Sequence, residues 1–149
     1  MRMSDICTPL TVHIAPDSSV REAARLMRER HVGAIVVLDR GDGRRAPVGI
    51  VTDRDIAISV VAAGVDPDTV TVRDVMSRPV ATCSEDQDVF DAIQTMRAHG
   101  VRRLPMLNAG GDFAGFVSAD DIFGALATEF RGLSGALVRE QAREIETRA

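Results

Sequence analysis

The chain has 149 residues, 45% of them hydrophobic and 27% charged, an ordinary globular composition that argues against extensive disorder. A formal net charge of −4, no Trp or Tyr and only five Phe argue against a nucleic-acid-binding protein. No apolar run approaches the ~20 residues that cross a bilayer, no signal peptide is recognisable, and two cysteines without metal-ligand spacing are typical of a reduced cytoplasmic protein.

The first half of the chain predicts five elements separated by turn signals. In chain order they are an extended segment at 11–14, a helix that starts after Ser19, strands at 34–38 and 48–51, and a second helix that starts at Thr52 and ends near Gly64. Ser19 and Glu22 form a capping-box pattern before apolar residues at helical spacing. The loop between the two strands is rich in Gly and Asp, which predicts an antiparallel hairpin.

The second half of the chain repeats the first. A shift of 69 positions aligns the halves up to the hairpin, and a shift of 66 aligns them after it, because the second hairpin loop is shorter. The matching pairs include Asp17 and Asp86, Val20 and Val89, Met27 and Met96, Leu38 and Leu107, Gly49 and Gly115, Thr52 and Ser118, and Asp55 and Asp121. We therefore expect two copies of one unit of about 60 residues, packed about a pseudo-twofold axis.

The second copy has the same order of elements, and a charged tail follows it. Its elements are an extended segment at 80–83, a helix that includes Val89 and Met96, strands at 103–107 and 113–117, and a helix from Ser118. The predicted repeats are residues 1–66 and 67–130, with a helical tail at 131–149. Pro105 within a strand predicts that its backbone nitrogen faces an edge or a ligand. The apolar stripe of the tail fits a solvated helix end as well as a partner-binding helix.

The motif most informative about function follows the second strand of each copy. Thr52 is followed three positions later by Asp55, and Ser118 by Asp121. A hydroxyl residue and an acid at this spacing form a helix capping box, which is the structural interpretation. The same positions suit a ligand, because a helix N-terminus attracts phosphate and a carboxylate that leaves the capping role can accept both hydroxyls of a ribose.

Two arginines make the copies electrostatically unequal. Arg102 and Arg103 precede the third element of the second copy, where the first copy has Gly33 and Ala34. An adjacent basic pair is ordinarily a solvated surface feature. The alternative is that the guanidinium groups make bidentate contacts with a phosphate bound in the crevice between the copies.

The order of the repeats, the hydroxyl-x-x-Asp motif and the run Val-Arg-Arg-Leu-Pro at 101–105 together resemble a tandem pair of cystathionine-β-synthase (CBS) domains, over residues 5 to about 130. The chain looks like a stand-alone bacterial protein of this kind. The resemblance implies an α/β fold with the order β-α-β-β-α in each repeat, two clefts and a homodimer. It also implies that the clefts bind an adenine nucleotide, namely AMP, ADP, ATP, NAD or S-adenosylmethionine, and that an unidentified protein is regulated.

The resemblance further implies a set of nucleotide-binding residues, without a metal or a catalytic cofactor. In this set Asp55 and Asp121 hold ribose, Thr52 and Ser118 contact ribose or phosphate, Arg102 and Arg103 contact phosphate, His13, Ile14, Thr82 and Cys83 line the base pocket, and Arg54 and Pro105 lie beside them. The first copy lacks the arginines, and Asp120 beside Asp121 adds negative charge near a phosphate. We therefore expect the two clefts to differ in ligand, or one of them to stay empty.

No phosphate-binding loop, dinucleotide fingerprint or zinc signature is present in the sequence, and the histidines do not recur at ligand spacing. The chain is therefore expected to be non-enzymatic. The first hypothesis is a regulatory module that senses an adenine nucleotide. The alternative is a structural dimerisation or protein-interaction module whose clefts no longer bind a ligand.

Overall fold

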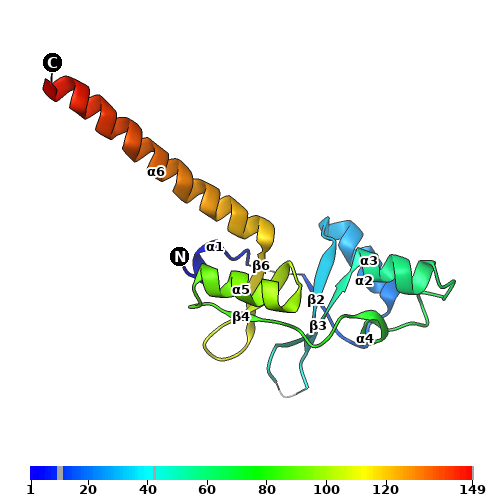
Figure 1. The fold of residues 1–149 in the computed structure, drawn as a ribbon. Helices are drawn as coiled ribbons and strands as arrows, with labels where there is room; N and C mark the ends of the chain where they lie inside the picture. Colours follow the sequence, from blue (N-terminus) through cyan, green and yellow to red (C-terminus); the bar gives the residue numbers. More distant parts are fainter. Residues whose placement is uncertain (10–11, 42, 149) are drawn as a thin grey trace.

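The computed structural model describes residues 1–9, 12–41 and 43–148 (Figure 1). In chain order its elements are α1 (Met3–Ile6), β1 (His13–Ile14), α2 (Val20–Arg30), β2 (Ala34–Asp39), β3 (Ala46–Thr52), α3 (Asp53–Ile56), the π-helix η1 (Ala57–Val61), α4 (Val72–Val75), β4 (Cys83–Ser84), α5 (Val89–His99), β5 (Arg103–Leu107), β6 (Phe113–Ser118) and α6 (Ala119–Arg148). The strands form two three-stranded sheets of the same topology, β1-β2-β3 and β4-β5-β6. The predicted α/β fold with two equivalent repeats is confirmed.

Both predicted hairpins are present, and the short strand before each of them pairs in parallel with the first strand of its hairpin. These short strands begin later than the sequence predicts. Strand β4 spans Cys83–Ser84 rather than 80–83, because its parallel pairing with β5 starts only where Cys83 meets Met106. Strand β1 spans His13–Ile14, and Thr11, at the start of the predicted segment, lies outside the described residues.

Pro105 lies in the central strand of the second sheet and not in an edge strand, while the alternative that its nitrogen faces a ligand stays a prediction. The proline is tolerated because β4 has only two residues, which pair with Met106 and Leu107. The β4–β5 ladder therefore begins at Met106 and does not include position 105. Pro105 pairs with Phe116 on the other side, and the N–H of Phe116 donates to the carbonyl oxygen of Thr8, away from the proline. No ladder hydrogen bond therefore requires an N–H at position 105.

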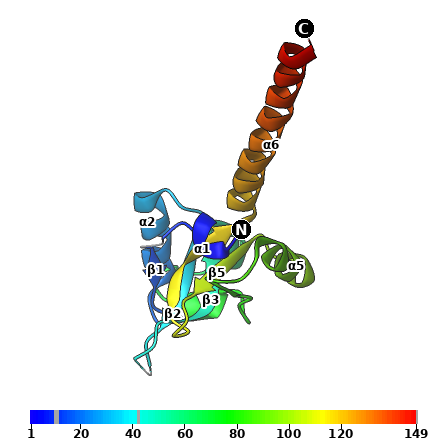
Figure 2. The same cartoon turned by 90° about the vertical axis from the view of Figure 1, so that its left-hand side faces the viewer.

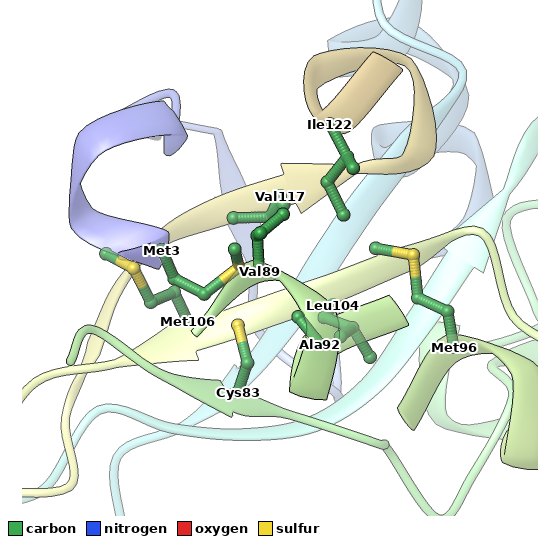
Figure 3. Packing of buried hydrophobic residues seen from close by; sticks show 9 residues of the cluster. All are labelled: Met3, Cys83, Val89, Ala92, Met96, Leu104, Met106, Val117 and Ile122. Atoms are coloured by element: carbon green, nitrogen blue, oxygen red, sulfur yellow. The ribbon is translucent and has the colours of Figure 1, made fainter. Parts of the chain in front are cut away.

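Each repeat buries one face of its sheet under its helices, and the two cores exchange their first helices. The core of the second repeat contains Met3 from α1 together with residues of β4, α5, β5, β6 and α6 (Figure 3). The core of the first repeat contains Val72 of α4 and Met76, the residue that follows α4. These residues belong to the start of the second repeat, as Met3 belongs to the start of the first. Met3 and Val72 are 69 positions apart and both are fully buried. The two repeats therefore form one interlocked unit.

The opposite faces of the two sheets pack against each other. Their contact is a small buried cluster of Val36 and Leu38 from β2 and Phe113 and Phe116 from β6, with Ile50 of β3 packed against it. The hairpin ends are also joined, because the N–H of Phe113 donates to the carbonyl oxygen of Arg45 at 2.9 Å. We call this the inter-repeat face. Residues that alternate with the core-facing positions of the strands lie on it.

The second helices of the two repeats differ in length. In the first repeat, η1 ends at Val61 and the turn that follows it reaches Gly64, whose φ of 67° gives the left-handed conformation common after a helix, close to the predicted end. In the second repeat, α6 continues from Ala119 to Arg148 and carries the charged tail away from the sheets (Figure 2). None of the helices in the described residues is both long enough and apolar enough to span a membrane.

Candidate functional site

The two hydroxyl-x-x-Asp motifs lie at equivalent strand-to-helix junctions. Thr52 is the last residue of β3 and precedes α3, and Ser118 is the last residue of β6 and precedes α6. They lie two positions after Ile50 and Phe116, which belong to the inter-repeat cluster. Because side chains alternate along a strand, both hydroxyls lie on the inter-repeat face, at its border with the helices.

Each motif forms a closed capping box. The backbone N–H and the hydroxyl of Thr52 both donate to Oδ2 of Asp55 at 2.8 Å, and the N–H of Asp55 donates to the Thr52 hydroxyl at 3.1 Å. In the second repeat, the N–H and hydroxyl of Ser118 donate to Oδ2 of Asp121 at 2.8 and 2.6 Å, and the return bond measures 3.1 Å. The structural interpretation of the motif is confirmed. Within the described residues no donor bonds Oδ1 of either acid, so one carboxylate oxygen is available.

A third box with the same two hydrogen bonds to its acid lies elsewhere and shows what the motif does without a ligand. The N–H and hydroxyl of Thr71 donate to Oδ2 of Asp74 at 2.9 and 2.8 Å at the start of α4. These two hydrogen bonds, first that of the backbone, lower the pKa of Asp74 from its ordinary value of 3.8. A capping box by itself is therefore a structural device, and a binding role needs further groups beside it.

Arginine side chains supply such groups in the second repeat only. Arg103 is directly opposite Ser118 in the β5–β6 ladder, which places the two side chains on the same face with their Cβ atoms about 5 Å apart. Arg103 is exposed and has no hydrogen-bond or ion-pair partner in the part of the chain that the structure describes. Arg102 instead pairs with Asp120 at 3.5 Å, and both of these side chains are about three-quarters exposed. The charge of Asp120 is thus met by Arg102, while the Arg103 guanidinium is available.

The first repeat has an acid, Asp53, at the junction where the second repeat has arginines. At the matching junction the N–H of Asp53 donates to the carbonyl oxygen of Gly33 at 3.0 Å, just as that of Ala119 donates to Arg102 at 2.9 Å. The Asp53 carboxylate lies so close to Gly33 that a Cβ there would be 3.1 Å from Oδ2. Arg54 follows on the exposed side of α3. The first junction therefore presents two carboxylates and one exposed arginine, and the second presents two carboxylates, one of them paired with Arg102, and the further arginine Arg103.

The residues predicted to line a base pocket divide between the two faces of the sheets. Ile14 and Cys83 are 5% and 3% exposed and lie in the cores of their repeats, where burial raises the pKa of the Cys83 thiol to about 11. Their side chains point into the cores and not toward the inter-repeat face, and their role as base contacts stays a prediction. His13 and Thr82 alternate with them and are half-buried.

One feature near His13 has no signal in the sequence. A cavity of about 480 Å³ lies at the carboxyl ends of β1 and β2, at the opposite end of β2 from Thr52. His13, Asp17, Glu22, Arg40 and Arg73 are among its lining residues, and Arg40 lies 3.1 Å from Nε2 of His13. Arg73 comes from α4, which joins this surface only because the repeats exchange helices. Sequence pattern therefore could not place these residues together.

Comparison with known proteins gives consistent results for fold and family. The family model "CBS domain" matches the chain twice, at residues 3–62 and 72–128. An uncharacterised protein of Methanopyrus kandleri is 41% identical over 108 residues, which are 72% of this chain and 54% of that protein, so the chain spans about half of its length. A CBS-domain-containing protein from Agrobacterium tumefaciens superposes with a TM-score of 0.71 at 27% identity, over 84% of this chain and 98% of that one. A hexameric CBS-CP12 protein from bloom-forming cyanobacteria gives a TM-score of 0.72 at 29% identity, over 83% and 69%.

Proposed function

Because the chain belongs to the CBS domain family, we propose that it is a non-catalytic regulatory module that binds an adenine nucleotide at the border of its inter-repeat face. CBS domains generally bind adenosine ligands, which supports the ligand class. The observation that carries the proposal is the arrangement in the second repeat, where unpaired Arg103 lies opposite Ser118 and Asp121 keeps one carboxylate oxygen available. A second copy of the chain and a regulated protein complete the proposed partners.

Each group at this junction has a role that follows from its chemistry. The Asp121 carboxylate accepts hydrogen bonds only, so its Oδ1 suits the hydroxyl groups of a ribose. Because Oδ2 alone makes the capping bonds, ribose binding does not require the carboxylate to leave the helix start. The Arg103 guanidinium suits phosphate, with which it can form two parallel charge-assisted hydrogen bonds.

The two junctions are proposed to differ in ligand because they differ in charge. Asp53 and Asp55 place two carboxylates at the first junction, which repel a phosphate. The second junction has Arg103 where the first copy has Ala34, and it is proposed to bind the phosphorylated ligand. The first junction is proposed to take an uncharged or cationic adenosine compound, or to stay empty.

The regulatory part of the proposal follows from the interlocked repeats. A ligand at the border of the inter-repeat face changes the balance between arrangements of the repeats only if it binds one arrangement more tightly. Because α1 and α4 are exchanged between the cores, a shift at this face is passed to both repeats. A partner protein that contacts either repeat can therefore read the bound state.

A thermal-shift titration of the full chain tests this proposal. The ligands are adenosine, AMP, ADP, ATP, NAD, S-adenosylmethionine and, as a base-specificity control, GTP. A ligand at 100 times its Kd adds about 2.7 kcal/mol, which raises the Tm of a chain of this size by roughly 5–10 °C. A dye must report unfolding, since the chain has no Trp or Tyr. A shift with adenine compounds but not with GTP supports the proposal.

The alternative function is a structural or protein-interaction module without a ligand. It is favoured by one observation: the Thr71–Asp74 box makes the same two hydrogen bonds to its acid as the two candidate junctions and lies outside them. If no adenosine compound changes the Tm of protein that mass spectrometry shows to be free of bound nucleotide, this alternative replaces the regulatory proposal.

A further inference from the structure

The outer part of α6 is exposed to solvent, and only Thr128 and Glu129 at its inner end face other described elements, near α1. Beyond Leu126, every described residue from 127 to 148 is exposed except Gly135, which is partly covered. Both views show this segment leaving the two sheets as a straight, isolated rod (Figures 1 and 2). Its conformation is therefore not explained by packing within one copy.

The large apolar residues of this rod lie on one side. Six of them are 55–71% exposed along α6: Phe123, Phe130, Leu133, Leu137, Val138 and Ile145. At 100° per residue they all fall within a sector of roughly 140°, and Arg139 lies on the opposite side. We call these six residues the apolar stripe. A helix that is surrounded by water gains no stability from placing its apolar side chains on one side.

A solitary helix of this sequence is also unfavourable in water. Isolated helices of this length are marginal even when rich in alanine, and most helix stability in proteins comes from packing of an apolar face. Gly124, Gly132 and Gly135 lie inside α6, and each costs about 1 kcal/mol relative to alanine. The segment therefore needs a partner surface that covers the apolar stripe.

We propose that this partner is the same helix of a second copy. Residues 127–148 contain four arginines and four glutamates, so the segment is neutral and two copies meet without repulsion. This balance does not favour nucleic acid, an anionic membrane or a strongly charged protein. Six side chains that each lose about 100 Å² would bury roughly 1,200 Å² over two copies, which exceeds the ~1,000 Å² of a specific interface.

The stripe also joins a second apolar surface at its inner end. Phe123 and Leu126 line a groove of about 330 Å³ between α5 and α6, whose other walls include Ile93, Met96 and Val101. Each copy thus has a continuous apolar surface that runs from this groove along α6 to Ile145. This inference extends the self-association in the proposed function and is independent of nucleotide binding.

The test is the mass of the full chain by size-exclusion chromatography with light scattering, at about 10–100 µM. The variant Leu133→Glu/Leu137→Glu places two charges in the stripe. The matched control Arg139→Glu changes the net charge by the same two units on the opposite side. We expect the double variant to have half the mass of the parent, and the control to keep the parent mass.

Three results decide the outcome. An equal mass for the parent and the double variant overturns the inference, even if both are dimers through other surfaces. A monomeric parent overturns it too, and a gain of helical circular dichroism with neutral lipid vesicles would then assign the stripe to a membrane surface. Since Leu133 and Leu137 are exposed within one copy, the Tm of the variant at low concentration should stay near that of the control, which separates loss of pairing from unfolding.

Discussion

The backbone N–H of Met3 donates a hydrogen bond to the carbonyl oxygen of Gln87 at 2.9 Å, and its symmetry counterpart, from Val72 to Ser18, measures 2.8 Å. Both bonds join the first helix of one repeat to the residue before the N-cap of the other repeat's next helix, α5 or α2. The side chains of Met3 and Val72 then fill the cores that these bonds lead into. Backbone hydrogen bonds and side-chain packing thus both hold the exchanged helices in place. Each repeat depends on the other to complete its core.

The first prediction concerns this exchange. Met3→Ala removes a fully buried side chain from the core of the second repeat and should destabilise the chain by about 2–5 kcal/mol. The matched control is Ser4→Ala on the same short helix, because Ser4 is exposed and bonds Glu85 only through its backbone. Urea unfolding should show one transition for both variants. A Met3→Ala variant as stable as the control would contradict the exchanged packing.

The second prediction separates capping from ribose binding. Asp121→Ala should cost stability and abolish binding of adenine nucleotides, because both functions use the same carboxylate. The chain supplies its own control in Asp74→Ala, which removes the same two hydrogen bonds to a capping-box acid away from the candidate site. Both variants lose the acid of a capping box, so a loss of stability is expected in either case. Isothermal titration should show lost binding only for Asp121→Ala, and equal binding by both variants would remove Asp121 from the site.

The third prediction concerns the phosphate. Arg103→Ala should weaken the binding of AMP by roughly 10–100-fold, the effect of a lost charged hydrogen bond, and leave the affinity for adenosine unchanged. Arg97→Ala, an exposed arginine on α5, serves as the control for net charge. Arg102→Ala should have the smaller effect, since Arg102 is already paired with Asp120. Equal weakening of AMP and adenosine by Arg103→Ala would show that this arginine does not touch phosphate.

The fourth prediction is a pH dependence with a defined sign. Backbone hydrogen bonds from Thr71 and Phe90 hold the pKa values of Asp74 and Asp88 below the ordinary 3.8. A carboxyl group whose folded-state pKa is lowered stabilises the fold above its unfolded-state pKa and loses this contribution as the pH falls through the folded-state value. The difference in urea midpoint between the parent and Asp74→Ala should therefore be constant at neutral pH and shrink below about pH 4. A difference that grows on acidification would contradict the assignment.

The fifth prediction concerns the two thiols. Burial raises the pKa of Cys83 to about 11 and raises that of the half-buried Cys7 as well. Native protein at pH 8 should therefore react with a thiol reagent at least about 100-fold more slowly at Cys83 than an ordinary cysteine does. The Cys7→Ser variant isolates Cys83, and its labelling should follow global unfolding in urea. Fast labelling of this variant would place Cys83 at an open surface.

Much of this architecture follows from the sequence because its signals are local. The hairpins and the helix starts at Ser19, Thr52 and Ser118 depend on residues within a few positions of each other, and the shifts of 69 and 66 positions show that these local signals recur. Capping bonds and apolar periodicity are satisfied inside one element, so they have the same meaning in any fold. The candidate ribose residues were proposed from a repeated motif, the candidate phosphate arginines from their absence in the first copy, and both roles from the resemblance to the family.

What only the tertiary structure decided depends on contacts between distant segments. The exchange of α1 and α4 joins residues more than 50 positions apart, and no local pattern distinguishes it from packing within one repeat. The direction of Cys83 into the core was set by its register with Met106, and a slip of one residue would have turned it to the inter-repeat face. Pro105 could occupy a central strand because its neighbour is short, which is a property of the neighbour and not of the proline.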